Sequence, residues 1–147
     1  MSNLIIIRGL PGSGKTTLAQ HLVKTEIEAG LSCWTRVEAD MYFVEDGVYK
    51  FDPSKIRDAH AWCQKTVKSL LASGQNVIVS NTFTTMKEVQ FYLDLVSKDD
   101  LMIIHCDDQN FGSIHNVPAE TIEKMKARFE PVEGEYLTST YRNTGSW

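Results

Sequence analysis

The residues best suited to chemistry form one run near the start of the chain, Gly9-Leu10-Pro11-Gly12-Ser13-Gly14-Lys15-Thr16. This run fits the pattern GxxxxGK[ST] and stands between an apolar segment and a helical one, as the motif requires. Its glycines let backbone N–H groups surround phosphate oxygens, Lys15 can reach the β and γ phosphates, and the Thr16 hydroxyl can hold Mg²⁺. The pattern predicts a nucleoside triphosphate site; the alternative is a glycine-rich turn that caps a helix.

A second group of polar residues follows the expected strands, at the sheet edge where ligands of open α/β sheets collect. The segment Glu38-Ala39-Asp40 ends one strand, and Asp40 is our candidate general base for an incoming hydroxyl. Asp40 could instead be a solvated loop carboxylate. Asn81 and Thr82 end another strand, and we expect them to contact the acceptor or a Mg²⁺ water unless they only cap the following turn.

The residues after Asp40 suggest where an acceptor would bind. Tyr42 and Phe43, with Tyr49 and Phe51, surround an Asp-Gly turn and could stack a nucleobase, or could bury one face of a hairpin. We find no glutamine or glutamate placed to activate water and no NKxD-like tetrapeptide, which disfavours a GTPase switch or a motor ATPase.

The elements that must position these residues follow from hydrophobic periodicity. Short β-branched runs alternate with helical segments, which predicts an α/β fold with a parallel sheet of about four to five strands flanked by helices. The expected strands are residues 4–7, 33–37, 76–80 and 101–105, and the expected helices are residues 15–29, 53–73, 86–96 and 118–129. We expect one domain over residues 1–147, with a polar tail over 131–147 that includes a short edge strand near Tyr136.

Composition and charge indicate which partners and which cellular compartment to expect. The chain has 15 basic and 19 acidic residues and a net charge of −4, unlike most nonspecific nucleic-acid binders. Residues 50–68 nevertheless carry five basic side chains against two acidic ones, a local landing site for a polyanion. No apolar run approaches the roughly 20 residues of a membrane helix, and the three cysteines form no CxxC pair. We expect a cytoplasmic protein with no membrane contact, no structural metal and no obligate protein partner.

Four segments together resemble the polynucleotide-kinase-type P-loop kinases, a group that includes the kinase domain of the phage polynucleotide 5'-kinase. They are Gly9 to Thr17, Asp40-Met41-Tyr42, Val79-Ser80-Asn81-Thr82 and Val117 to Met125, and the resemblance extends to about residue 131. It implies that the phosphate loop through Thr17 binds ATP and Mg²⁺ and that Asp40 is the general base. It also implies a nucleotide lid from Asp107 to Val117, with Asn110, Gly112 and His115 as candidate contacts.

The chain differs from this family pattern at several charged positions, above all at arginines. Phe43 stands where the phage enzyme has an arginine that holds the acceptor phosphate, and Asn81 stands where its third strand ends in aspartate. No arginine occurs between Arg57 and Arg128, so Arg128 is the candidate for stabilising transition-state charge unless it is a solvated helix residue.

The sequence thus predicts a P-loop kinase that moves the γ-phosphate of ATP to a hydroxyl, with the 5' end of single-stranded DNA or RNA as the expected acceptor. Two alternatives remain open at this point. One is a kinase for a small molecule, a nucleoside or a modified-base hydroxyl. The other is an ATP-binding regulatory or toxin-like module without turnover.

Overall fold

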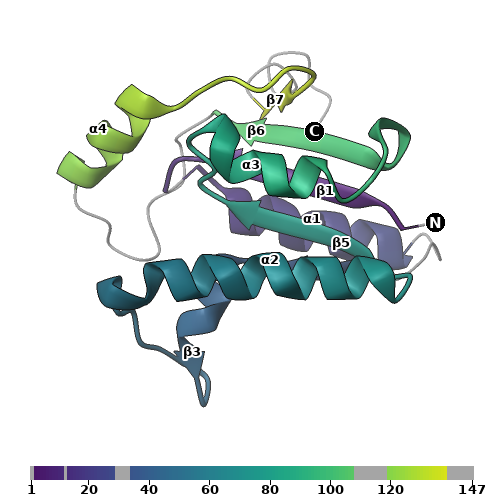
Figure 1. Cartoon of the computed structure of the whole chain (residues 1–147), viewed down its shortest axis with the longest axis horizontal. Helices are drawn as coiled ribbons and strands as arrows, with labels where there is room; N and C mark the ends of the chain where they lie inside the picture. The colour runs from purple at the N-terminus through teal and green to yellow at the C-terminus, as the bar shows by residue number, and fades with distance from the viewer. Residues whose placement is uncertain (1, 12, 29–33, 108–118, 139–147) are drawn as a thin grey trace.

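The computed structural model describes residues 2–11, 13–28, 34–107 and 119–138, and its centre is a five-stranded parallel sheet (Figure 1). The strand order is β2-β5-β1-β6-β7, so the strand before the phosphate loop lies in the middle. The strands are β1 (Leu4–Gly9), β2 (Trp34–Val37), β5 (Asn76–Asn81), β6 (Leu101–Cys106) and β7 (Tyr136–Leu137). All four pairings are parallel, which confirms the expected α/β fold class and the edge strand near Tyr136.

Helices cover both faces of this sheet. On one face α1 (Lys15–Glu28) packs Leu18 and Ala19 against Ile7 and Ile78. On the other face lie α2 (Ile56–Ala72) and α3 (Met86–Leu93), in front of the sheet in Figure 1. The central strands are apolar on both faces because both are covered. α4 (Ala119–Arg128) lies beyond the edge toward which the strands point.

The aromatic insertion between β2 and α2 differs from the long hairpin that its sequence predicts. Tyr42 and Phe43 belong to a 3₁₀ helix, η1 (Ala39–Phe43), and the hairpin is only β3 (Val44–Glu45) and β4 (Val48–Tyr49). The Met41 N–H bonds the Glu38 carbonyl at 3.0 Å, so the chain coils before it extends. The predicted Asp-Gly turn is present, with positive φ at Asp46 and Gly47.

Two helices begin or end differently from their apolar periodicity. The segment Pro53–Lys55 forms a separate 3₁₀ turn, η2, whose N-cap Asp52 accepts the Ser54 N–H at 3.0 Å before α2 begins. α3 ends at Leu93 although the apolar pattern runs to Val96, because the Leu95 N–H bonds the Tyr92 carbonyl three residues back and tightens the chain. A last 3₁₀ turn, η3 (Lys98–Asp100), leads into β6.

A fully buried cation ties the C-terminal segment to the central strand. Arg8 on β1 is 0% exposed, and its Nη1 lies 2.7 Å from Glu135 Oε2. Its guanidinium also donates to the Phe83 carbonyl and lies 4.2 Å from the ring centroid of Phe129. His105 stacks on Phe129 and contacts Glu135, and burial lowers the pKa of this histidine.

We expect Glu135→Ala to lower the free energy of unfolding by about 3 to 5 kcal/mol, because it leaves a buried guanidinium without its counter-charge. Urea unfolding followed by circular dichroism measures this loss. Glu133→Ala, an exposed carboxylate in the same segment, is the matched control and should change stability by less than about 0.5 kcal/mol. Equal losses in the two variants would show that the Arg8 pair does not hold the segment.

Candidate active site

The phosphate loop begins at Gly9, where the backbone approaches its neighbours too closely for a side chain. A Cβ on Gly9 would lie 2.5 Å from Ser13 Oγ and 2.7 Å from the Cys106 carbonyl oxygen. Gly14 has φ 88°, a left-handed conformation that favours glycine. Ser13 Oγ is buried and has no hydrogen-bond partner among the described residues, as expected of a loop shaped around an anion. Gly12, another predicted ATP contact, lies outside the described residues.

Lys15 begins α1 at the end of this loop. Burial lowers the pKa of its ammonium to about 8, against smaller opposing effects of Cys106, Glu38 and Asp40. The ammonium donates to the Leu10 carbonyl at 2.9 Å, so its charge is solvated by the loop itself. A buried ammonium at a helix N-terminus is suited to binding phosphate oxygens. Thr17, also predicted to contact ATP, is exposed in the first turn of α1.

Glu38 is the residue that sequence reasoning left without a role. Its Oε1 accepts hydrogen bonds from the Thr16 and Ser80 hydroxyls, each at 3.0 Å. The same oxygen lies 3.1 Å from Arg36 Nη1. The carboxylate therefore joins α1, β2 and β5 beside the phosphate loop. Position in the chain carried a signal, because Glu38 directly follows β2 and functional groups collect at the strand ends of such sheets.

Thr16 and Glu38 fit a magnesium site. Mg²⁺ prefers oxygen ligands, keeps several waters and needs only one or two protein groups beside the substrate phosphates. Within the described residues no group of three or more His, Cys, Asp or Glu side chains is arranged to hold a metal. The 3.0 Å contact between the Thr16 hydroxyl and a carboxylate is the pair through which these residues would hold the ion.

Asp40, the candidate base, lies on η1, two residues beyond Glu38. Its Oδ1 is 3.4 Å from the Tyr49 hydroxyl, and burial followed by the charge of Asp40 raises the pKa of Tyr49 to about 12. Tyr49 therefore keeps its proton and presents it to the carboxylate. The charge of Asp40 also acts on Lys15, so the candidate base and the phosphate-loop cation belong to one site.

The four predicted acceptor contacts have different environments. Tyr42 is exposed, whereas Phe43 is only 6% exposed and packs in the core. Asn81 is buried as well: its Oδ1 accepts the Ala39 N–H at 2.8 Å and its Nδ2 lies 3.6 Å from Cys63 Sγ. The Asn81 amide thus anchors the start of η1. Thr82 supplies its carbonyl to the Gly9 N–H at 3.3 Å.

The other predicted site residues lie toward the C-terminal end. Arg128 ends α4, is exposed, and has its Nε 3.3 Å from the Thr84 hydroxyl. The predicted lid contacts Asn110, Gly112 and His115 lie outside the described residues. The structure therefore brings Lys15, Thr16 and Asp40 together, adds Glu38, and holds Arg128 to the loop after β5.

The profile of a protein family described as an AAA domain matches residues 4–132. The chain belongs to this family. It is also 27% identical over 138 residues to human NEDD4-binding protein 2; the match covers 86% of this chain and the chain spans only 8% of the length of that protein.

None of the helices in the described part of the chain is long and apolar enough to span a membrane.

Solved structures share the fold of this chain at low sequence identity. A protein in the Pnkp1/Rnl/Hen1 RNA repair complex has a TM-score of 0.64 at 22% identity, over 90% of this chain and 48% of that one. A gluconokinase from Sinorhizobium meliloti 1021 has a TM-score of 0.60 at 14% identity, over 92% of this chain and 81% of the gluconokinase. Kti12 from Chaetomium thermophilum, in complex with ADP-AlF3, has a TM-score of 0.62 at 19% identity, over 91% of this chain and 87% of Kti12. The chain therefore shares its fold with this repair protein, with the gluconokinase and with Kti12.

ATP binding should take up protons at a pH of about 8.5 and not at pH 7. With a pKa of about 8, Lys15 is largely neutral at the higher pH, and a bound triphosphate restores its proton because it favours the charged form. Calorimetry in two buffers of different ionisation enthalpy measures the uptake. Equal binding heats in both buffers at the higher pH would contradict the shifted pKa.

Glu38→Gln should weaken the apparent affinity for Mg²⁺ in the presence of ATP by about 10- to 100-fold, because the amide removes the charge that holds the ion and its waters. A Mg²⁺ titration of ATP turnover measures this affinity. Asp99→Asn on η3, an exposed acid at the opposite edge of the sheet, is the control and should leave the titration unchanged. An unchanged titration for Glu38→Gln would remove this residue from the magnesium site.

Proposed function

We propose that this chain transfers the γ-phosphate of ATP to the 5'-hydroxyl of a polynucleotide. One observation carries the phosphotransfer: Glu38, two residues before Asp40, accepts a hydrogen bond from the Thr16 hydroxyl at 3.0 Å, directly beside Lys15 of the phosphate loop. A cation for phosphates, a metal-side carboxylate and a second carboxylate for the incoming hydroxyl are the parts that such a reaction requires.

In this mechanism Asp40 accepts the proton of the acceptor hydroxyl as its oxygen forms a bond to the γ-phosphorus. The bond between the γ-phosphorus and the β–γ bridging oxygen breaks, and ADP leaves. Lys15 holds the β and γ oxygens and neutralises charge that develops on them. Bound Mg²⁺ would stabilise the same charge, with Thr16 and Glu38 as its protein partners.

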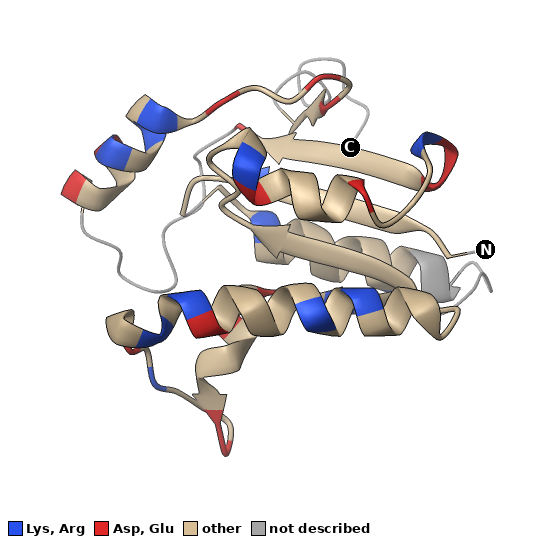
Figure 2. Cartoon of the chain, in the orientation of Figure 1, with Lys and Arg blue, Asp and Glu red and all other residues tan. Residues whose placement is uncertain are grey.

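The distribution of charge supports a polyanionic acceptor despite the net negative chain. Figure 2 places basic side chains along α2 and α4, which carry Arg57, Lys65 and Lys68, and Lys124, Lys126 and Arg128 respectively. Basic residues of α4 and of the first turn of α2, on the side toward which the strands point, would attract a phosphodiester backbone. The structural likeness to the RNA repair protein agrees with this choice of acceptor.

Arg128 is the cation that we propose for the charge of the transition state. It ends α4, the helix beyond the edge toward which the strands point, and one contact to Thr84 is its only described hydrogen bond. The guanidinium has five N–H donors, so the remaining donors would be available to a triphosphate. The sequence segment 107–117 is proposed as the lid over the nucleotide.

A small-molecule hydroxyl is the second candidate acceptor. The net charge of −4 is unfavourable for a long polyanion, and the gluconokinase shares the fold over most of both chains. A single sugar or nucleoside hydroxyl would use Lys15, Glu38 and Asp40 in the same way.

Asp40→Asn should lower transfer to a 5'-hydroxyl oligonucleotide by about 100-fold or more, because the amide cannot accept the proton. ATP affinity should stay within about twofold of the unchanged protein. Incubation with γ-labelled ATP and Mg²⁺, with label counted on the oligonucleotide 5' end, measures transfer. Asp46→Asn at the exposed hairpin turn is the matched control and should transfer normally.

Parallel reactions with nucleosides and sugars separate the alternatives. Label on these compounds but not on DNA or RNA would replace the polynucleotide acceptor with a small one. Tight ATP binding with no transfer to any hydroxyl would instead make nucleotide occupancy the output. Full activity of Asp40→Asn would exclude it as the base.

A further inference from the structure

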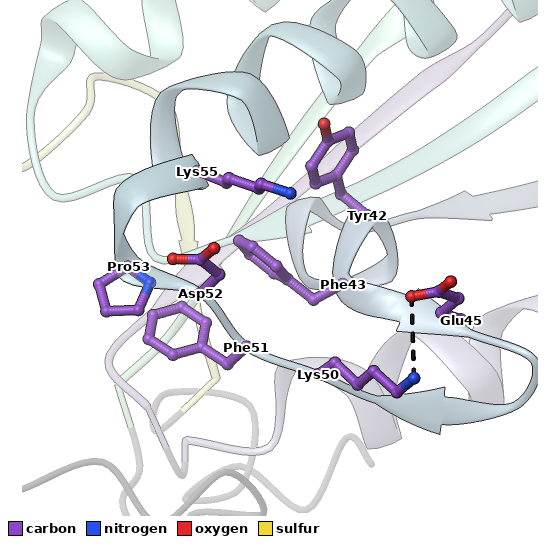
Figure 3. Close-up of a pocket in the computed structure, with 8 residues that line it drawn as sticks. All are labelled: Tyr42, Phe43, Glu45, Lys50, Phe51, Asp52, Pro53 and Lys55. Atoms are coloured by element: carbon purple, nitrogen blue, oxygen red, sulfur yellow. Dashed lines mark ion pairs between the residues drawn. The ribbon is translucent and has the colours of Figure 1, made fainter.

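A pocket of about 520 Å³ lies between η1, the hairpin and η2, outside the phosphate loop (Figure 3). Three aromatic rings and four charged side chains line it, together with Pro53: Tyr42, Phe43, Phe51, Glu45, Lys50, Asp52 and Lys55. None of the residues assigned to ATP or Mg²⁺ belongs to this lining. The pocket is therefore a separate feature of the acceptor side.

The rings of this pocket offer both a floor and walls to a flat ligand. Phe43 is 6% exposed, whereas Phe51 is 50% exposed and Tyr42 38%. The Phe43 ring lies 5.1 Å from that of Phe51 and 5.6 Å from that of Tyr42, both edge to face. Phe43 thus supports two rings that remain accessible, and such rings stack nucleobases of any sequence.

Two cations, Lys50 and Lys55, stand among the charges of the pocket. Lys50 lies 3.9 Å from Glu45, and Asp52 accepts from the Ser54 N–H and hydroxyl. In the described part of the chain no carboxylate forms an ion pair with Lys55. Figure 3 shows its side chain extending from η2 across the pocket toward Tyr42, so its ammonium stands beside the rings.

The pocket is connected to the candidate base through a single residue. The Tyr49 hydroxyl is 3.4 Å from Asp40 Oδ1, and the Tyr49 ring stacks on Phe51 with their centroids 6.3 Å apart. A ligand on Phe51 is therefore one aromatic side chain away from the reacting position. Val44, Val48 and Ile56 are also exposed nearby in sequence, which gives this region more apolar surface than a solvated hairpin needs.

We propose that this pocket binds a nucleotide of the acceptor strand downstream of the reacting one, its base stacked on Phe51 and Tyr42 and its phosphate on Lys55. This inference rests on the proposed polynucleotide acceptor. A base with an adjacent phosphate matches the combination of accessible rings and a lysine ammonium in one pocket, which a sugar does not. Recognition of this kind tolerates any base and requires more than a single nucleoside.

The test measures equilibrium binding of a 5'-hydroxyl hexanucleotide, labelled with fluorescein at its 3' end, to the full chain by anisotropy. Phe51→Leu keeps an apolar side chain but removes the aromatic face, and should weaken binding about five- to tenfold. Abasic sites placed one at a time along the hexanucleotide locate the stacked base. At one or two downstream positions the abasic site should weaken binding similarly, and Phe51→Leu should then add less than about twofold.

Lys55 has a closely matched control. Lys55→Ala should weaken binding about threefold or more and lower the slope of log affinity against log salt by about one, because one phosphate contact is lost. Lys98→Ala removes another lysine from a 3₁₀ turn, at the opposite edge of the sheet, and should change neither quantity. Equal effects of the two lysines would reduce Lys55 to general electrostatics and overturn its phosphate role.

Binding and transfer, measured on the same samples, separate this inference from the proposed function. Transfer to the oligonucleotide with binding unaffected by Phe51→Leu and by every abasic site would overturn the pocket and leave the kinase standing. Binding that responds as expected, without transfer, would keep the pocket and overturn the polynucleotide kinase. No binding of the hexanucleotide by the unchanged protein would overturn the pocket assignment, and would favour a protein or small-molecule occupant.

Discussion

The buried guanidinium of Arg8 is the constraint on which the assembly of this fold depends. Arg8 is fully buried in the central strand, immediately before the phosphate loop, and a charge in that position is tolerated only when it is paired and hydrogen bonded. Its partners come from the loop after β5 and from the C-terminal segment: the Phe83 carbonyl, the Glu135 carboxylate and the Phe129 ring. The end of the chain must therefore dock for the central strand to be stable.

At the candidate active site the charge of Glu38 is likewise paired and hydrogen bonded. Glu38 accepts hydrogen bonds from two hydroxyls and pairs with one guanidinium. The three partners belong to three different elements, so the carboxylate aligns β2 and β5 with the first turn of α1. Parallel strands bring their carboxyl ends to one edge, which is why these groups can meet. The anchor of Asn81 on the Ala39 N–H then sets where η1 starts, and with it the position of Asp40. The geometry of the candidate site is thus built from buried and partly buried polar contacts between elements.

The acceptor side follows a different principle, because apolar packing dominates there. Phe43 is a buried support for Tyr42 and Phe51. A cation, Lys55, reaches the same pocket from the neighbouring 3₁₀ turn η2. A core phenylalanine and a surface lysine are each ordinary in isolation, and only their arrangement around one pocket gives them a common role.

The phosphate loop, the α/β class and the Asp-Gly turn could be predicted from the sequence, because each depends on local chemistry: glycine backbone freedom, hydrophobic period and left-handed turn residues. The sequence also marked Asp40, since strand ends of such sheets collect functional groups. The folded chain was needed to find the contacts of Glu38, the burial of Asn81 and the pairing of Arg8 with Glu135. Those depend on residues 22 to 127 positions apart meeting at buried or partly buried hydrogen bonds, and no local pattern encodes which distant partner a polar side chain will find.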